Sequence, residues 1–207
     1  MIIIDCEQRS PEWFEARRGI PTASRFGDVL ATLKSGKPSA ARTAYLHELA
    51  IERLSGQMTE HYVNAAMQRG SDLEPIARDA YTRVTGRPVK EVGFIRHDRL
   101  QTGCSPDGFV GLEGLLEIKA PSNPTRLIEA LAMHDAGEYQ PQVQGQIWIT
   151  EADWCDLTIF HPAIPPRIIR VERDDAYIIN LEYEIERFTS ELDALVLTLR
   201  KRLGMEY

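Results

Sequence analysis

The chain contains few cysteines, and they are not arranged in pairs. Cys6, Cys104 and Cys155 are odd in number and far apart in the sequence. A disulfide framework or a zinc site is built from closely spaced cysteines, so neither is expected here. We therefore expect these cysteines to behave as small, buried, apolar side chains.

Long apolar runs are also missing. No segment has the roughly 20 consecutive apolar residues that a membrane-spanning helix needs. The apolar start at residues 1–4 is shorter than a secretory signal and is followed at once by Asp5. We expect a cytoplasmic protein that makes no contact with a membrane.

The sequence has no excess of positive charge. Its 24 basic and 31 acidic residues give a formal net charge of −7. This composition argues against a protein that coats nucleic acid nonspecifically, but not against an enzyme whose basic residues are concentrated locally. Residues 1–45 hold seven lysines and arginines against five acids, so positive charge is displaced toward the N-terminal region.

The length and the order of apolar patterns predict one domain. A chain of 207 residues with 43% hydrophobic residues can bury a sizeable core, so we expect a single domain over residues 1–207. Helical spacing predicts helices at 13–18, 22–30, 39–54 and 64–85. Pro75 lies inside the last of these and predicts a break or kink near Glu74.

The second half of the sequence has a mixed pattern. Short strands are expected at 89–97, 100–104, 109–110 and 115–120, and glycines 108, 111 and 114 predict a hairpin-like region. Helices are expected at 125–134 and 140–150, strands at 154–161 and 167–172 on either side of a proline turn, and a long amphipathic helix at 176–203. This order predicts an α/β fold with a mixed central sheet flanked by helices.

The most informative segment is Ser105-Pro106-Asp107-Gly108 together with Leu116-Glu117-Ile118-Lys119. On a strand, Glu117 and Lys119 project from the same face while Ile118 points into apolar packing. Two carboxylates and an ammonium at one place form a divalent-metal site with a charge partner, which indicates phosphodiester hydrolysis. The plainer alternative is a turn at Asp107-Gly108 and an exposed ion pair between Glu117 and Lys119.

The spacing Asp107…Glu117-x-Lys119 resembles the core of the PD-(D/E)xK nucleases. Three further motifs occur in the order typical of one of their families, the lambda-exonuclease and YqaJ-type viral recombinases. They are Trp13-x-x-x-Arg17-x-Gly19-x-x-Thr22-Ala23-Ser24, Gly70-x-x-x-Glu74-x-x-Ala77-Arg78 and Tyr139-x-x-Gln142-Val143-Gln144. The resemblance extends from about Trp13 into the last helix and implies a restriction-endonuclease-like core.

This resemblance implies a metal centre. Asp107, Glu117 and the backbone carbonyl of Ile118 are the implied ligands of Mg²⁺, for which Mn²⁺ is a possible substitute. Glu74 is the implied further acid, able to complete a second metal position. Lys119 would orient or deprotonate the attacking water, or neutralise charge in the transition state, and the sequence does not decide between these roles.

The resemblance also implies contacts with DNA. Four polar residues would surround the 5′-phosphate of the strand being degraded: Arg17, Ser24, Ser105 and Gln142. The planar fork of arginine suits a terminal phosphate. Arg18 stands beside Arg17, but the spacing to Gly19 favours Arg17. Lys34 is the implied basic contact with the duplex, and Met67 the implied apolar wedge at the end base pair.

The activity implied by the resemblance is processive, Mg²⁺-dependent 5′-to-3′ digestion of linear double-stranded DNA, which leaves 3′ single-stranded overhangs. The implied assembly is a homotrimeric ring that cooperates with a single-strand annealing protein in recombination, encoded by a phage or prophage in a bacterial host. A restriction-like endonuclease and a noncatalytic DNA-end-binding scaffold are the alternatives. The phosphate-pocket motifs speak against the first, and intact Asp107, Glu117 and Lys119 against the second.

Overall fold

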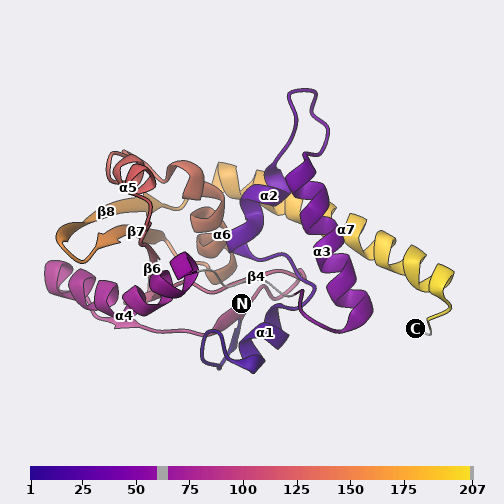
Figure 1. Ribbon diagram of the computed structural model, residues 1–207, viewed down its shortest axis with the longest axis horizontal. Helices are drawn as coiled ribbons and strands as arrows, with labels where there is room; N and C mark the ends of the chain where they lie inside the picture. The colour runs from indigo at the N-terminus through magenta and orange to yellow at the C-terminus, as the bar shows by residue number, and fades with distance from the viewer. Residues whose placement is uncertain (60–64, 206–207) are drawn as a thin grey trace.

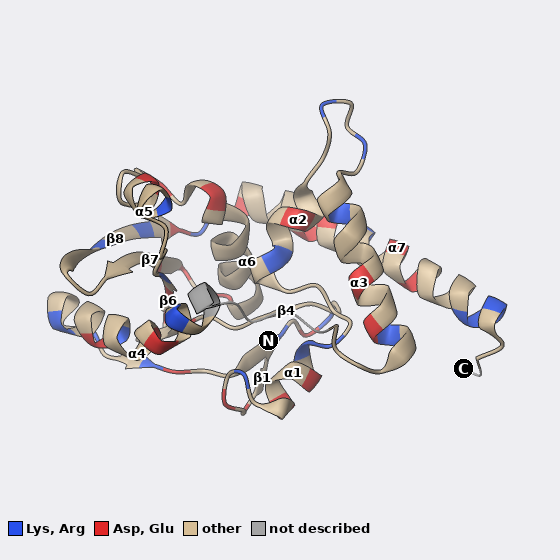
Figure 2. Cartoon of the chain, in the orientation of Figure 1, with Lys and Arg blue, Asp and Glu red and all other residues tan. Residues whose placement is uncertain are grey.

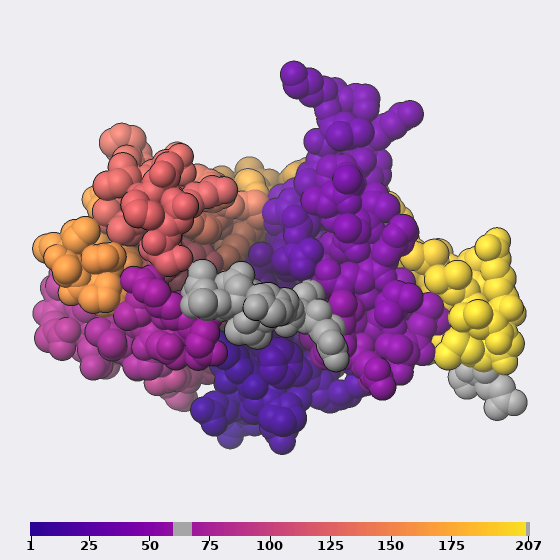
Figure 3. All heavy atoms as spheres, in the orientation of Figure 1, coloured from indigo at the N-terminus to yellow at the C-terminus, as the bar shows by residue number. Residues whose placement is uncertain are grey.

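The computed structural model describes residues 1–59 and 65–205, excepting the side chains of residues 65–67 (Figure 1). The N-terminal part of the chain is mainly helical, as its apolar spacing predicts. Its elements are β1 (Ile2–Ile4), α1 (Pro11–Arg17), a 3-10 turn (Ala23–Arg25), α2 (Phe26–Leu30), α3 (Ala40–Ser55) and α4 (Ala65–Thr85). The loop between α2 and α3 forms a hairpin that projects from the body (Figure 3).

A five-stranded mixed sheet forms the centre of the molecule, which confirms the predicted fold class. Its strand order is β2-β5-β6-β7-β8. The strands are β2 (Val89–Lys90), β5 (Gly108–Val110), β6 (Gly114–Lys119), β7 (Trp154–His161) and β8 (Ile164–Glu172). Among these described strands, only β6 and β7 pair in parallel. A parallel pair needs a long crossover connection, which here contains α5 (Pro124–Leu131) and α6 (Gln140–Thr150).

The two faces of β6 pack against different helices. Leu116 and Ile118 join an apolar cluster with Ala77 and Tyr81 of α4. Leu115, on the opposite face, belongs to the larger core formed with α2, α3, α6 and α7 (Asp175–Leu203). Alternation along this strand therefore directs Glu117 and Lys119 toward α6 rather than α4.

The predicted strand at 89–97 is divided between two sheets. Its first part is β2, whereas β3 (Phe94–Arg96) joins β1 and β4 (Gly103–Cys104) in a three-stranded sheet. The chain changes sheets at Gly93, where a Cβ atom would lie 2.2 Å from the carbonyl oxygen of Cys6. A single continuous strand was therefore the wrong prediction, because residues 94–96 pair with β1 whereas residues 89–90 pair with β5.

Prolines are tolerated at two places that the sequence pattern treated as interruptions. Helix α4 continues through Pro75 without a break, since Ala77 and Tyr81 in its next turn are fully buried against the sheet. Strand β8 begins before Pro165 and Pro166 and includes both. It is an edge strand, and both prolines lie at the irregularity of the β7–β8 ladder, where neither has a paired residue on β7.

The remaining expectations concern burial. Cys104 and Cys155 are buried and Cys6 is partly buried, and none forms a disulfide. None of the described helices combines the length and apolar character needed to cross a membrane. Helix α7 runs along the body and its C-terminal end extends beyond it (Figure 1).

A buried carboxylate joins α4 to the sheet. Asp156 on β7 is 2% exposed and accepts hydrogen bonds from the Tyr81 hydroxyl at 2.6 Å and from Arg170 of β8 at 2.5 and 3.0 Å. The Arg170 guanidinium also lies 3.5 Å from the centroid of the Trp154 ring. Removing the carboxylate would leave a hydroxyl and a guanidinium without their acceptor.

We expect Asp156→Ala to lower the free energy of unfolding by about 3 kcal/mol, because breaking this ion pair leaves the Arg170 guanidinium without an opposite charge. Glu138→Ala is the matched control, since the pair of Glu138 with Arg126 is mostly exposed. Its effect should stay within about 1 kcal/mol. Denaturant unfolding measures both, and equal effects of the two substitutions would contradict the structural role of Asp156.

Candidate active site

The β5–β6 hairpin places Asp107 beside the end of β6. The Asp107 backbone N–H donates to the carbonyl of Leu116 at 3.0 Å, and Gly108 pairs with Leu116 in the strand register. The Asp107 carboxylate accepts a hydrogen bond from the backbone N–H of Ile118 at 2.6 Å. Gln8 supports the same loop from outside by donating to the carbonyl of Pro106 at 3.0 Å.

Glu117 is the most constrained acid of the site. It is 4% exposed, and its two carboxylate oxygens accept hydrogen bonds from Gln142 at 2.6 Å and Gln146 at 2.7 Å. The Lys119 ammonium lies 2.8 Å from the same oxygen that Gln142 contacts. The predicted convergence of Glu117 and Lys119 on one face is therefore present, and the face is buried rather than exposed.

Lys119 acts as a hydrogen-bond donor in this arrangement. Its ammonium donates to the side-chain carbonyl of Gln142 at 2.8 Å and lies 5.1 Å from the centroid of the Tyr139 ring. Burial works to lower the pKa of Lys119, but the Glu117 carboxylate more than offsets this, so the pKa is raised. The side chain is therefore held as a cation.

Asp107 is buried close to two other acidic side chains. Burial raises the pKa of Asp107 well above its usual value, and the charges of Glu117 and Glu74 raise it further. The candidate metal ligands are carboxylate oxygens of Asp107 and Glu117. Such hard oxygen atoms suit Mg²⁺, a cation that usually binds through one or two carboxylates plus waters. The residues present thus fit a divalent metal ion at Asp107 and Glu117.

Glu74 faces the site but is engaged elsewhere. It lines a cavity of about 820 Å³ with Asp107, and its carboxylate pairs with Arg9. Within the described part of the chain, no three His, Cys, Asp or Glu side chains converge as a metal-binding group. The metal-ligand roles of Asp107, Glu117, Glu74 and the Ile118 carbonyl all stay predictions.

Arg17 and Ser105 are joined through Trp13. Ser10 caps α1 by accepting the Trp13 backbone N–H at 3.2 Å, and one helical turn later the Arg17 guanidinium lies 3.8 Å from the centroid of the Trp13 ring. The indole N–H of Trp13 donates to the Ser105 hydroxyl at 2.8 Å. One aromatic side chain therefore links the predicted phosphate-binding arginine to the loop that carries Asp107.

Arg17 has no acidic partner in the described structure. No Asp or Glu there lies within ion-pair distance of its guanidinium, although Arg18 next to it pairs with Glu15. Burial lowers the pKa of Arg17 to about 10. Even so, the group is charged near neutral pH; the Glu52 carboxylate acts on it electrostatically, but none of the described carboxylates forms an ion pair with it.

The other predicted residues are placed less closely together. Ser24 is exposed at the 3-10 turn, 3.3 Å from the Thr22 hydroxyl. Gln142 contacts Glu117 and Lys119, and its contact with a 5′-phosphate stays a prediction. Lys34 lies in the exposed hairpin between α2 and α3, which Figure 2 shows with basic residues. The side chain of Met67 lies outside the described residues.

Two residues of the site were not predicted from sequence. Gln146 follows Gln142 by four residues, so helical spacing places both on the face that meets Glu117 and could have identified it. Gln144, the glutamine that the motif does contain, instead donates to the carbonyl of Glu172 at 2.8 Å. Trp13 opens the first of the motifs, but no local signal shows its contact with Ser105, 92 residues away.

Comparisons with known proteins bear on the family and the fold of this chain. The profile of the YqaJ-like viral recombinase domain matches residues 12–153. An alkaline exonuclease (LHK-Exo) from Laribacter hongkongensis is 40% identical, with 94% of this chain and 98% of that chain covered and a TM-score of 0.86. Its complex with dAMP matches equally well.

A phage related exonuclease from Haemophilus somnus 129PT is 18% identical, with a TM-score of 0.70 over 87% of this chain and 96% of that chain. At that identity the likeness shows the fold alone. Comparison with curated proteins gives no match.

We expect Asp107→Asn to stabilise the metal-free protein near neutral pH. Because the pKa of Asp107 is raised in the folded protein, ionising this carboxyl costs folding free energy, and asparagine avoids that cost. The cost is absent below the ordinary aspartate pKa of about 4 and grows as pH rises toward the raised value. Asparagine can still accept the Ile118 N–H bond.

Denaturant unfolding in EDTA at pH 5 and pH 8 tests this expectation, and the gain should be larger at pH 8. Asp79→Asn, on an exposed position of α4, is the matched control. A variant less stable than the parent at pH 8 would show that Asp107 is not under electrostatic strain.

Proposed function

The chain belongs to the YqaJ-like viral recombinase domain family and is a nuclease related to alkaline exonucleases, and from this premise we propose its reaction. The protein is a Mg²⁺-dependent exonuclease that degrades linear double-stranded DNA from its 5′ ends in the 5′-to-3′ direction. It leaves 3′ single-stranded overhangs for recombination by strand annealing.

The direction of attack is supported chiefly by Arg17. A partly buried guanidinium without an acidic partner favours an external anion, and a terminal phosphate offers the doubly charged target that the planar fork of arginine binds best. Trp13 ties this cation to Ser105, two residues before Asp107. A 5′-phosphate held by Arg17 and Ser105 would therefore lie next to the proposed metal-binding carboxylates.

The metal centre in this proposal is held by Asp107, Glu117 and the carbonyl of Ile118. A bound Mg²⁺ supplies an activated water and offsets charge on the phosphate being cleaved. Gln142 and Gln146 fix the orientation of the Glu117 carboxylate. Glu74 can become a further metal ligand when its ion pair with Arg9 breaks.

Lys119 contributes a positive charge. Its ammonium already donates to Glu117 and Gln142, so it is positioned as a donor. We assign it to stabilising the negative charge that develops on the phosphate oxygens, in preference to removing a proton from water.

Each cleavage exposes a new 5′-phosphate, so the same pocket can be used at every step. We propose that processivity comes from a homotrimeric ring around the duplex. A closed ring keeps hold of DNA by topology, which accords with a chain of net charge −7 and does not require a broadly basic surface. The overhang produced would be passed to a single-strand annealing protein.

The reaction is tested with purified protein, Mg²⁺ and three duplex substrates: linear with 5′-phosphate, linear with 5′-hydroxyl, and closed circular. We expect fast loss of the phosphorylated linear DNA and release of mononucleotides. At each end, the strand that terminates in a 3′ end should remain as a single-stranded overhang. Lys119→Ala protein serves as the control for contaminating nuclease. Cleavage of circles would instead indicate an endonuclease, and binding without cleavage a noncatalytic scaffold.

We expect Arg17→Ala to reduce the preference for 5′-phosphate over 5′-hydroxyl by about 10-fold or more, because a charge-assisted contact contributes about 1.5–3 kcal/mol. Arg17→Lys keeps the charge but not the fork, so its preference should be intermediate. Arg83→Ala, at an exposed position of α4, is the matched control. An unchanged preference in Arg17→Ala would place the phosphate pocket elsewhere.

A further inference from the structure

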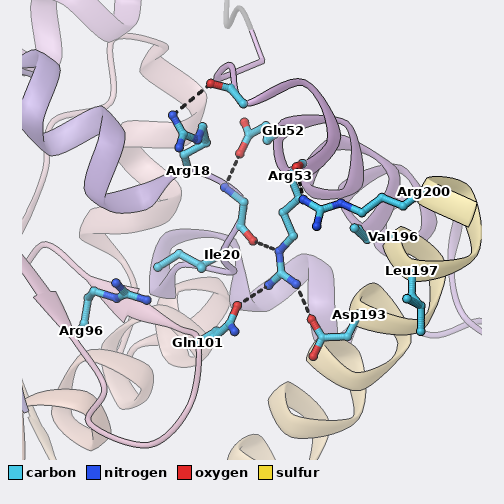
Figure 4. Close-up of a pocket in the computed structure, with 12 residues that line it drawn as sticks. Arg18, Ile20, Glu52, Arg53, Arg96, Gln101, Asp193, Val196, Leu197 and Arg200 are labelled. Atoms are coloured by element: carbon cyan, nitrogen blue, oxygen red, sulfur yellow. Dashed lines mark hydrogen bonds and ion pairs between the residues drawn. The ribbon is translucent and has the colours of Figure 1, made fainter. Parts of the chain in front are cut away.

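A second cationic cavity lies outside the proposed active site. It has a volume of about 500 Å³ and opens between the end of α1, the end of α3, the loop before β4 and the C-terminal half of α7 (Figure 4). Ile20, Val196 and Leu197 give it an apolar floor. Four arginines and two carboxylates surround this floor: Arg18, Arg53, Arg96, Arg200, Glu52 and Asp193. We call the whole cavity the arginine pocket.

Both carboxylates of the arginine pocket are already in use. Glu52 is 1% exposed and accepts backbone N–H groups of Gly19 at 2.8 Å and Thr59 at 3.0 Å. Asp193 forms an ion pair with Arg53. Arg53 in turn donates to the carbonyl of Gly19 and to Gln101, so its guanidinium is fully engaged in holding the wall together (Figure 4).

Arg96 and Arg200 are different. Neither has an acidic partner within the described part of the chain, and the Arg96 side chain makes no hydrogen bond there. Arg200 makes one long bond, 3.4 Å to the carbonyl of Arg53, and its buried Nε atom has no partner among the described atoms. Two arginine charges are therefore left without counter-charge, in a protein whose overall charge is −7.

The arginine pocket adjoins the proposed 5′-phosphate site. Arg17 and Arg18 are consecutive residues, and Arg17 stacks on Trp13 while Arg18 lines the second cavity. The contact of Gly19 with Glu52 lies at the junction between them. Because a DNA strand carries a phosphate on every nucleotide, a substrate held at Arg17 presents further phosphates close by.

We propose that the arginine pocket binds the DNA backbone, with Arg96 and Arg200 facing separate phosphates from opposite sides of the cavity and the sugar between them on the apolar floor. The inference rests on the proposed action on DNA. Guanidinium groups match phosphate geometry, and the combination of free cations with an apolar surface suits a sugar–phosphate unit better than a free anion. These phosphates belong either to the duplex or to the strand that escapes degradation.

The test measures DNA binding in EDTA, where no hydrolysis interferes, at several salt concentrations. The variants are Arg96→Gln, Arg200→Gln and the double substitution, with Arg83→Gln as the control from an exposed site. We expect the double variant to bind about 10-fold more weakly and to lose about 0.9 from the salt slope for each duplex phosphate contact, or about 0.7 for a single-strand contact. Arg96→Lys with Arg200→Lys should retain the slope.

A 5′-phosphorylated duplex and a single-stranded oligonucleotide are compared to identify the source of the phosphate. A loss confined to the duplex places the contact on double-stranded DNA, and a loss with both probes places it on the single strand. An unchanged affinity and slope with both probes would overturn the proposal. So would an altered mass in solution with unchanged DNA binding, because the pocket would then receive an acidic segment of a second copy.

The wild-type protein separates this inference from the proposed function. If it fails to degrade any of the three duplexes while the double variant binds DNA more weakly and with the reduced salt slope, the proposed reaction fails and the pocket stands. If it degrades phosphorylated duplex while the double variant binds as well as the parent, the pocket fails and the reaction stands. Melting temperatures of all variants exclude loss of folding.

Discussion

A carboxylate can be buried in a protein core only when its charge and hydrogen bonds are satisfied, and the site depends on how this is done for Glu117. The hydrogen bonds come from Gln142 and Gln146, both on α6, and the opposite charge comes from Lys119. Helix α6 can reach Glu117 because it belongs to the crossover between the parallel strands β6 and β7. The parallel pairing of these two strands is thus the feature that brings amide donors over the acid.

The same arrangement supports the proposal of a metal ion at this place. Lys119 offsets one negative charge at Glu117, but Asp107 lies beside it with a raised pKa and Glu74 approaches from the facing cavity. Protonation would neutralise the remaining charge but make the carboxyl groups weak ligands, whereas a divalent cation binds their ionised form. Amide side chains are suitable neighbours for such a site, because they orient a carboxylate and add no further charge.

Part of this site follows from sequence alone. Period-two alternation predicts that Glu117 and Lys119 share a face, and four-residue spacing could have placed Gln146 beside Gln142. Contacts between distant segments obey no such rule. The bond from Trp13 to Ser105 and the change of sheet at Gly93 depend on how N-terminal elements pack on the centre. The continuity of α4 through Pro75 likewise depends on tertiary burial, which outweighs local propensity.

The consecutive arginines at the end of α1 show how a chain of net charge −7 can still act on a polyanion. A broadly basic surface is unnecessary when a few guanidinium groups are left without acidic partners at chosen points. Arg17 is such a group, and Arg96 with Arg200 are two more, whereas Arg18 and Arg53 are neutralised by Glu15 and Asp193. Neutralised arginines contribute little long-range attraction, so we propose that phosphate is held at unpaired arginines that line a pocket.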